Sequence, residues 1–365
     1  MFKSIRIIFF MLITIFFLQN CSKTSSDSSM FRANPQRTGV YKTKCLDELS
    51  GVKWKFETGY WIGSSPAIHD GLVYFGSDDN HLYALDSDTG QLKWKFETGN
   101  HVYSSPAISD GIVYFGSWDD NFYALDSKTG QLKWKFETGS WIRSSSVILG
   151  ALVYFGSDDG YLYALDSNTG KLKWKFQTLG TVNSSPAIYD GIVCFGSNDR
   201  NFYAVDSETG KLKWKFQTGS AINSSPAISG GIVCIGSDDM NFYALDFETG
   251  KLKWKCATGG AINSSPAICD GIVYLGSDDG YFYALDFNTG RIKWKFQTGD
   301  DIKTSPSISG GLVYFGSEDG YLYALNIRTG KLKWKFELVN IISSSPSISD
   351  GIIYFGAIKY LYALE

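Results

Sequence analysis

The sequence predicts an all-β protein, an eight-bladed β-propeller of four-stranded antiparallel blades whose ring is closed by the N-terminal strand. Three observations support this fold class. A forty-residue repeat runs through the chain without a slip, and repeats of this length indicate a solenoid or a propeller. Each repeat ends in a turn followed by strictly alternating apolar and charged residues, which is typical of a strand with one buried face. The incomplete units at the two ends of the chain complete one another.

Tryptophan marks the last strand of each repeat. In the unit YALDSNTGKLKWKFQT, residues 163–178, the Asp and Gly of DSNTG favour a turn, and Leu172, Trp174 and Phe176 then alternate with lysines. Lysine on an outer strand also discourages aggregation between sheets. We expect the tryptophans to act as structural docking residues between blades, and they are Trp54, Trp94, Trp134, Trp174, Trp214, Trp254, Trp294 and Trp334.

Four strands are expected in each unit. In the unit from Ser184 to Gly219 the predicted strands are Ser184–Ile188, Ile192–Ser197, Phe202–Asp206 and Lys211–Gln217. An x-Ser-Pro motif marks the first strand at Pro66, Pro106, Pro186, Pro226, Pro266, Pro306 and Pro346, with Ser146 in the remaining place. The last unit stops after its third strand, and the first tryptophan strand, Val52–Glu57, has no blade before it. We therefore expect Val52–Glu57 to complete the last blade.

The N-terminus has the pattern of an export signal. Lys3 and Arg6 precede the apolar run Ile7–Leu18, which is too short to span a bilayer comfortably. The sequence Leu18-Gln19-Asn20-Cys21 resembles a bacterial lipobox, in which Cys21 becomes the lipidated N-terminus, although most lipoboxes have Gly or Ala where Asn20 stands. The alternative is ordinary secretion, with a cysteine there by chance.

Three parts of the chain follow from these patterns. Residues 1–20 are expected to be a signal peptide, residues 21–40 a lipid-anchor tether and a segment leading into the fold, and residues 41–365 the propeller. The remaining cysteines are Cys45, Cys194, Cys234, Cys256 and Cys269, several of which replace aromatic residues of other repeats. We expect no structural disulfide and no zinc site, because equivalent strand positions of neighbouring blades lie too far apart to bridge and no Cys-x-x-Cys pair occurs.

The repeat resembles a known family. The pattern YALDxxTGxLKWKF is similar to the tryptophan-docking repeat of the PQQ-like (pyrroloquinoline-quinone repeat) β-propellers, and the resemblance runs from about Phe31 to Glu365. The segment FRANPQRTG, residues 31–39, resembles a sequence that commonly leads into the propeller in that family. The signatures of WD40 and kelch propellers are missing.

The resemblance implies one of two functional classes. One class comprises quinoprotein alcohol and glucose dehydrogenases, which bind PQQ and calcium and are longer. The other comprises non-catalytic proteins similar to the lipoprotein B subunit of the outer-membrane β-barrel assembly machinery. The export signal and the plain ring favour the second class. We therefore expect a non-enzymatic protein-binding scaffold of the bacterial envelope without a cofactor. The alternatives are a PQQ-dependent dehydrogenase and a ligand-sensing propeller module.

Neither metal chemistry nor catalysis is indicated by the residues. The acidic pairs Asp78-Asp79, Asp158-Asp159, Asp238-Asp239 and Asp278-Asp279 recur once per blade in turns, where we expect them to stabilise the turn rather than to bind calcium. The three histidines, His69, His81 and His101, are expected to be solvated turn residues, although a metal role for His81 and His101 stays open. No nucleophile elbow, P-loop or HExxH motif occurs.

A candidate binding surface emerges from comparing the blades. The first and third turns barely change, whereas the second turn and the linker between blades do. These two variable segments are expected on one face, with the linker at the mouth of the central channel. One linker position, called the slot here, holds Gly63, Tyr103, Arg143, Asn183, Asn223, Asn263, Lys303 and Ser343 in successive blades. The predicted partner-binding rim comprises Trp61, His101, Tyr103, Trp141, Arg143 and Lys303. The alternative is drift in tolerant turns.

The partners expected from charge and location are proteins of the envelope, with β-barrel assembly components among the candidates. A net charge of −3 with evenly spread Lys and Arg argues against nucleic acid. Contact with the membrane is expected through the lipid anchor alone, and the propeller is expected to be a monomer. The expected location is the outer membrane, facing the periplasm, and the alternative is a secreted or surface-exposed protein.

Overall fold

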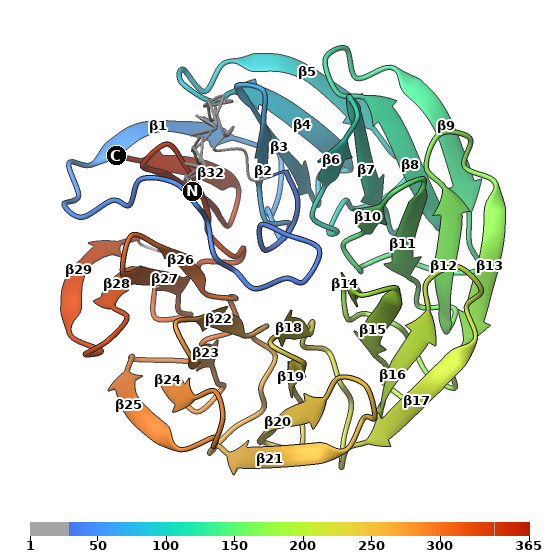
Figure 1. Cartoon of the computed structure of the whole chain (residues 1–365). Coiled ribbons are helices and arrows are strands. Elements are labelled where there is room, and N and C mark those ends of the chain that lie inside the picture. The colour runs from blue at the N-terminus through green and yellow to red at the C-terminus, as the bar shows by residue number, and fades with distance from the viewer. Residues whose placement is uncertain (1–28, 339) are drawn as a thin grey trace, which may run out of the picture.

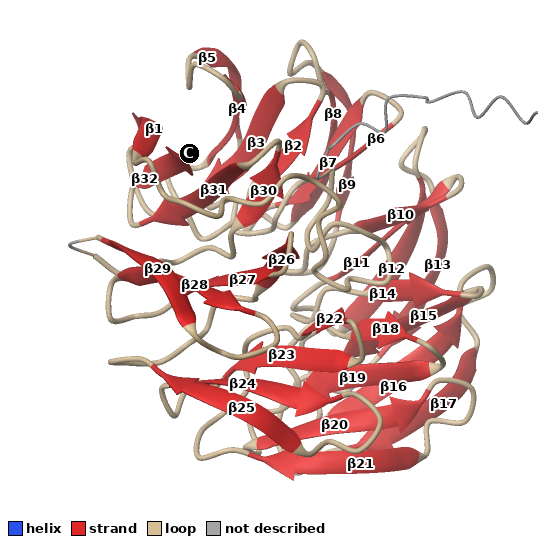
Figure 2. Ribbon diagram, turned by 60° about the vertical axis from the view of Figure 1, so that its left-hand side comes forward, coloured by secondary structure: helices blue, strands red, loops and turns tan. Residues whose placement is uncertain are grey.

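The computed structural model describes residues 29–338 and 340–365. Within them, thirty-two strands form eight separate four-stranded antiparallel sheets, arranged as a ring around a central channel (Figure 1). The predicted eight-bladed β-propeller is confirmed. Figure 2 shows strands and loops only, and the described residues include no helix that would be long and apolar enough to cross a membrane. The predicted signal peptide and Cys21 lie outside the described residues.

The innermost strand of each blade is only three residues long. The prediction of Ser184–Ile188 began too early, because Pro186 has no N–H and the N–H of Ser185 donates to Ser225 Oγ of the next blade at 3.0 Å instead of pairing within its own sheet. The inner strands are β2 (Ala67–His69), β6 (Ala107–Ser109), β10 (Val147–Leu149), β14 (Ala187–Tyr189), β18 (Ala227–Ser229), β22 (Ala267–Cys269), β26 (Ser307–Ser309) and β30 (Ser347–Ser349).

The two middle strands of each blade are apolar and buried on both faces, as their uninterrupted apolar sequences predict. The second strands are β3 (Leu72–Ser77), β7 (Ile112–Gly116), β11 (Leu152–Gly156), β15 (Ile192–Gly196), β19 (Ile232–Gly236), β23 (Ile272–Gly276), β27 (Leu312–Gly316) and β31 (Ile352–Ala357). The third strands are β4 (His81–Asp86), β8 (Asn121–Asp126), β12 (Tyr161–Asp166), β16 (Asn201–Asp206), β20 (Asn241–Asp246), β24 (Tyr281–Asp286), β28 (Tyr321–Asn326) and β32 (Tyr360–Leu364).

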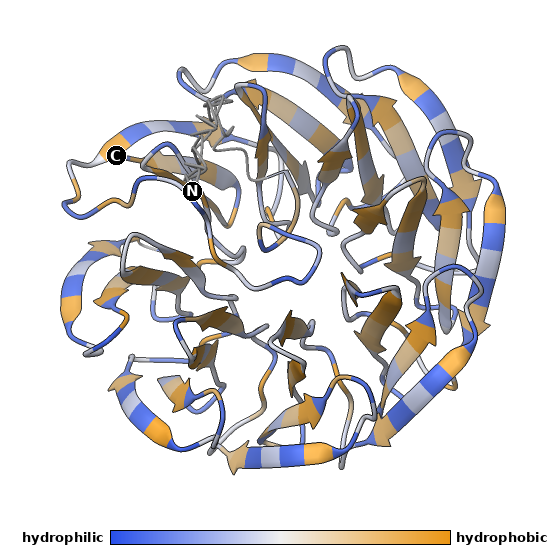
Figure 3. Ribbon diagram, viewed as in Figure 1, coloured by the Kyte–Doolittle hydropathy of each residue, from blue (hydrophilic) through white to orange (hydrophobic). Residues whose placement is uncertain are grey.

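The outer strands carry the alternating pattern, which Figure 3 shows as bands of hydrophobic and hydrophilic residues around the ring. They are β5 (Leu92–Glu97), β9 (Leu132–Glu137), β13 (Leu172–Gln177), β17 (Leu212–Gln217), β21 (Leu252–Ala257), β25 (Ile292–Gln297), β29 (Leu332–Glu337) and β1 (Val52–Glu57). Each tryptophan reaches into the following blade. Trp174 Nε1, for example, donates to the Ser207 carbonyl at 3.0 Å, and its indole lies on Gly210 so closely that a Cβ there would meet the ring at 2.6 Å.

The hydrophobic core lies between the blades. Eight clusters of buried side chains each combine residues from two adjacent sheets, and one of them joins the last blade to the first. In that cluster, Trp54, Leu361 and Ala363 of the last blade pack with Val73 and Phe75 of the first. Each blade is therefore stabilised by its two neighbours, so the ring depends on complete closure.

The predicted closing strand is confirmed. β1 pairs antiparallel with β32, with Trp54 opposite Ala363 and Phe56 opposite Leu361. The last blade lacks the third turn that would receive the tryptophan of the preceding blade. Leu46 takes its place, because its carbonyl accepts from Trp334 Nε1 at 3.0 Å. The N-terminal part of the chain thus replaces both a strand and a turn.

The segment before β1 closes one end of the central channel, which sequence analysis did not anticipate. We call residues 29–41 the channel segment; Figure 1 shows the N-terminal part of the chain crossing the middle of the ring. Its backbone carbonyls accept hydrogen bonds from the inner strands of five blades, at the N–H groups of Ile108, Ile188, Ile228, Ile268 and Ile308. These bonds satisfy inner edges that would otherwise be unpaired.

Two buried arginines fasten the channel segment to the ring. Arg37 donates from Nε to the Pro186 carbonyl at 2.6 Å and from Nη2 to the carbonyls of Ser145 and Ser146 at 3.0 and 3.1 Å. Arg32 binds the Ser265 carbonyl at 2.9 Å and the Pro266 carbonyl. Every hydrogen bond that these guanidinium groups donate to a described residue ends on a backbone carbonyl.

Among the described residues, no carboxylate forms a hydrogen bond with either guanidinium group. Burial lowers the pKa of Arg32 to about 10 and, with the neighbouring charge of Arg32, lowers the pKa of Arg37 to about 9. Both remain protonated at neutral pH, so the inner carbonyl dipoles of several blades stabilise two cations at the closed end of the channel.

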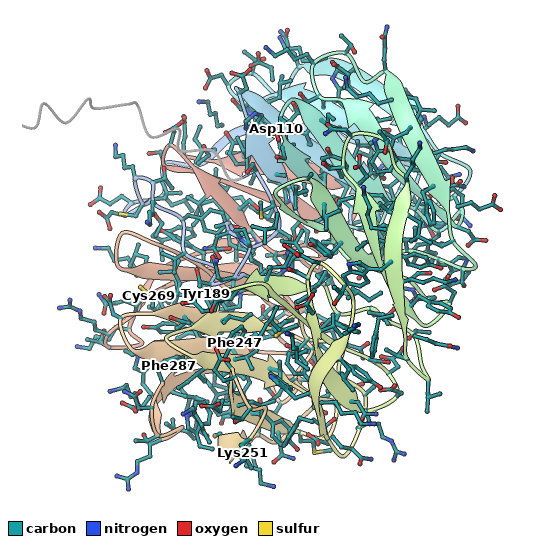
Figure 4. All side chains as sticks on the ribbon, turned by 45° about the vertical axis from the view of Figure 1, so that its right-hand side comes forward. Asp110, Tyr189, Phe247, Lys251, Cys269 and Phe287 are labelled. Carbon is teal, nitrogen blue, oxygen red and sulfur yellow. The ribbon has the colours of Figure 1, made fainter. Side chains whose placement is uncertain are left out.

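The face that carries the first and third turns is therefore the closed face. On this face the rings of Tyr189 and Phe247, both labelled in Figure 4, meet edge to face at 5.2 Å. Among the described residues the five cysteines are free. Cys194 and Cys234 are fully buried and replace tyrosines of other blades, in line with their expected role as small apolar residues.

Candidate functional site

The central channel is open on the face formed by the second turns and the linkers. These segments bond to one another, as where Asp78 N–H donates to the Trp61 carbonyl at 2.7 Å, so the prediction that they share a face is confirmed. The open end leads into a cavity of about 350 Å³ with Phe31 of the channel segment among its lining residues. We call this opening the mouth. The mouth is the accessible end of the channel, because the channel segment closes the other end.

A ring of serines lines the cavity below the mouth. Each blade has a serine directly before the proline position of its x-Ser-Pro motif. The N–H of this serine donates to the hydroxyl of the equivalent serine in the next blade, and Ser345 N–H closes the circle onto Ser65 Oγ at 3.1 Å. The other links join Ser65, Ser105, Ser145, Ser185, Ser225, Ser265, Ser305 and Ser345 in order. Because this ring uses the same atoms in every blade, it holds the mouth in shape without distinguishing one side from another.

The slot residues differ from blade to blade and so make the sides of the mouth unequal; all eight line the cavity. In four blades the slot residue contacts the acidic residue that begins the second turn, fifteen positions later, in the pairs Arg143–Asp158 (3.0 Å), Asn223–Asp238 (3.0 Å), Asn263–Asp278 (2.9 Å) and Lys303–Glu318 (2.9 Å). The other acidic residue of the turn has a structural role. Asp159, for example, accepts from the Tyr163 hydroxyl at 2.6 Å and from Gly139 N–H at 2.9 Å.

An aromatic cluster lies on the side of the mouth formed by the first three blades. The rings of Trp118 and Trp141 stack at 4.7 Å with an angle of 2° between their planes. The guanidinium of Arg143 lies 4.8 Å from the Trp118 ring centre and 5.1 Å from that of Trp141. The rings of His101 and Tyr103 also pack against Trp118, with centre-to-centre distances of 5.1 and 5.9 Å. This arrangement fixes the cluster while Trp61, Tyr103 and Trp141 keep 39%, 42% and 39% of their surface exposed.

Asp78 differs from the other acidic residues of the second turns. Its slot residue is Gly63, and the ring of Tyr103 fills the nearby space so closely that a Cβ on Gly63 would lie 2.4 Å from it. Asp78 consequently lines the cavity, whereas Asp158, Asp238 and Asp278 do not. Among the described residues, the basic side chain that contacts Asp78 is His101, with Nδ1 3.5 Å from Asp78 Oδ1.

The predicted rim residues fall into two groups. Trp61, Tyr103 and Arg143 line the mouth on the side of the aromatic cluster, with His101 and Trp141 packed in that cluster just behind them. Lys303 lines the mouth from the seventh blade, apart from the cluster, and forms ion pairs with Asp301 at 3.2 Å and Glu318 at 2.9 Å. Sequence reasoning did not assign Trp118 to the site, and it interpreted Asp78 as a turn residue only.

A family model and several solved structures match this chain. A family model described as outer membrane protein assembly factor BamB matches residues 44–149, 140–226 and 217–363. The chain belongs to this family. No match to this BamB-family chain is found among curated proteins.

Solved structures similar to this BamB-family chain come from both functional classes. BamB from Moraxella catarrhalis is 18% identical with a TM-score of 0.74, over 86% of this chain and 99% of that one. Quinohemoprotein alcohol dehydrogenase from Comamonas testosteroni is 16% identical with a TM-score of 0.81, over 93% and 80%. The computationally designed Ika8 protein is 23% identical with a TM-score of 0.76, over 84% and 96%. At these identities the likeness shows the shared propeller fold.

The electrostatics of the mouth in this BamB-family protein are set by partly buried carboxylates. Burial raises the pKa of Asp158, Asp238 and Asp278, and their contacts with Arg143, Asn223 and Asn263 oppose that shift. Burial also raises the pKa of Asp78, opposed by His101. Burial and the charge of Asp78 raise the pKa of Tyr103, so its phenol is neutral at physiological pH. The mouth therefore combines aromatic rings with carboxylates whose charge is incompletely compensated.

Proposed function

We propose that this protein is a non-catalytic, protein-binding scaffold of the bacterial envelope that acts in outer-membrane protein assembly. The observation that carries the proposal is the distribution of tryptophan. The chain has 11 tryptophans, of which eight dock the blades; of the remaining three, Trp61 lines the mouth, and Trp118 and Trp141 stack on one another in the aromatic cluster. Exposed aromatic rings beside an arginine are the usual centre of a protein–protein interface. The family description supports the assembly role.

A quinone enzyme is supported less well by the residues at the mouth. PQQ carries three carboxylates and would need cationic partners. Arg143 is already paired with Asp158, and Lys303 with Asp301 and Glu318, while Asp78 adds a further negative charge. Calcium would need converging oxygen ligands. The one acidic group of this kind among the described residues is Asp300, Asp301 and Glu318, where Lys303 already binds two of the carboxylates. The residues present do not fit PQQ with calcium.

The proposed location follows from the N-terminal sequence and the family. We propose that residues 1–20 are removed as a signal peptide and that Cys21 carries the lipid that holds the protein at the outer membrane, facing the periplasm. The tether would join the propeller at Ser29, whose carbonyl binds Ile108 N–H at 2.7 Å on the inner strand of the second blade. The eight peptide links from Cys21 to Ser29 reach at most about 28 Å, so the ring would stay close to the membrane.

Capture of partners with a rim variant tests the scaffold role. We expect the variant Trp61→Ala, Trp141→Ala, Arg143→Ala to recover at least about tenfold less partner from solubilised envelope than the parent, since truncating central aromatic and arginine side chains often costs 2 kcal/mol or more each. The matched control is Asn183→Ala, Asn223→Ala, Asn263→Ala on the other side of the same mouth, with thermal melts for both. Equal recovery by the rim variant and the control would reject this surface as the binding site.

A further inference from the structure

Comparison of the repeats shows which side chains pair with the acidic residue that begins the second turn. In four blades the carboxylate has a partner at the slot, which is Arg, Lys or the amide of Asn. Three of these carboxylates use Oδ2 for the contact, and in those blades the carboxylate no longer lines the cavity. A cation or an N–H donor is thus the group that completes this position.

In the first blade the position is incomplete. Gly63 offers no side chain, and the basic side chain that contacts Asp78 comes from the next blade, where His101 Nδ1 lies 3.5 Å from Asp78 Oδ1. Asp78 remains part of the cavity wall, and His101 only opposes the effect of burial on its carboxylate. Burial raises the pKa of Asp78, and a neighbouring carboxylate, Asp79, acts in the same direction. A cation supplied from outside would stabilise the ionised form of Asp78.

The third blade contains the completed version of the same arrangement. There the guanidinium of Arg143 lies 3.0 Å from Asp158 Oδ2 and 5.1 Å from the ring centre of Trp141, within the range of cation–π attraction. Trp61 stands in the first blade where Trp141 stands in the third. The first blade therefore has the carboxylate and the aromatic ring but lacks the cation, and the exposed face of Tyr103 supplies a second ring.

We propose that the recess formed by Asp78, Trp61 and Tyr103 binds a cationic side chain, lysine or arginine, of the partner polypeptide. This inference rests on the proposed scaffold function and names the chemistry of the partner. The ammonium or guanidinium group pairs with Asp78 Oδ2, and the alkyl stem of the side chain lies against the aromatic rings. The charge of Asp78 is available to such a cation, because neither Trp61 nor Tyr103 carries a charge at neutral pH and the cations that line the mouth, Arg143 and Lys303, already have carboxylate partners.

Blocked amino acids test the recess without any partner protein. Titration of the full propeller with N-acetyl-lysine amide or N-acetyl-arginine amide is expected to shift the NMR signals of the Trp61 indole and the Tyr103 ring, with N-acetyl-norleucine amide at least tenfold weaker. Asp78→Asn is expected to weaken the cationic probes at least tenfold. Asp238→Asn, the equivalent change at a carboxylate that Asn223 already covers, is expected to leave them unchanged. A second variant, Trp61→Ala, read at Tyr103, is expected to weaken them about threefold to tenfold.

Three results would overturn the inference: equal binding of the norleucine and lysine probes, equal losses in Asp78→Asn and Asp238→Asn, or unchanged binding in Asp78→Asn. Tighter binding of free putrescine than of the blocked lysine would also contradict it, because the site would then belong to a small amine. The titration is independent of partner capture. If the cationic probes do not bind the recess while partner capture is normal, this inference alone is rejected. If the probes bind but the rim variant captures as much partner as the parent, the scaffold site alone is rejected.

Discussion

A chain that begins at residue 58 is expected not to fold into a stable ring. It lacks β1, so β32 loses its partner strand and the cluster between the last and first blades loses Trp54. It also lacks Leu46, which receives Trp334, and both buried arginines of the channel segment. Each blade relies on two neighbours, and an open seam exposes a long edge strand that promotes aggregation. The expected result is aggregated protein without a cooperative thermal transition.

The matched control is a chain that begins at Ser29, which keeps every described contact. It is expected to elute as a monomer and to melt within a few degrees of the parent, measured by size-exclusion chromatography and circular dichroism. A chain from residue 58 that is monomeric and melts like this control would show that the ring does not need the N-terminal strand.

Replacing Arg37 with methionine is expected to lower the free energy of unfolding by about 3–5 kcal/mol, since each buried acceptor left without a donor costs about 1–3 kcal/mol and the side chain serves several carbonyls. Arg37→Lys is expected to recover only part of the loss, because a single ammonium does not reproduce the fork of a guanidinium. Urea denaturation measures the effect through the shift of the midpoint at unchanged slope.

Arg328→Met is the control for this series, because Arg328 lies exposed on the closed face, next to the third turn of the seventh blade. Its effect is expected to stay within about 0.5 kcal/mol. If Arg37→Met were as mild as Arg328→Met, the channel segment would not be a structural part of the ring, and the closed end of the channel would be open in solution.

The ring was predictable because its information is repeated. The tryptophan spacing, the alternation in the outer strands and the unmatched Val52–Glu57 fix the number of blades and the closing strand. The channel segment was not predictable. FRANPQRTG occurs once, has no periodicity and buries two arginines, which local patterns assign to the surface. Its carbonyl partners come from several blades and are neighbours only in the closed ring.

The site was partly predictable for a related reason. Differences between blades located the mouth and gave Trp61, Tyr103, Arg143 and Lys303 as lining residues. The pairing of the slot with the residue fifteen positions later is present in the sequence, and it marks Asp78 as an acidic residue whose slot, Gly63, offers no side chain. The stacking of Trp118 on Trp141 crosses from one blade to the next and needs the structure.

The channel segment closes one end of the channel, and we propose that partners bind at the open mouth. Photo-crosslinking from defined positions in the cell envelope tests it most directly, with p-benzoyl-phenylalanine in place of Trp61 at the mouth or of Lys251 on the closed face (Figure 4). We expect a protein adduct from position 61 and none from position 251. Adducts from position 251 with none from position 61 would contradict it.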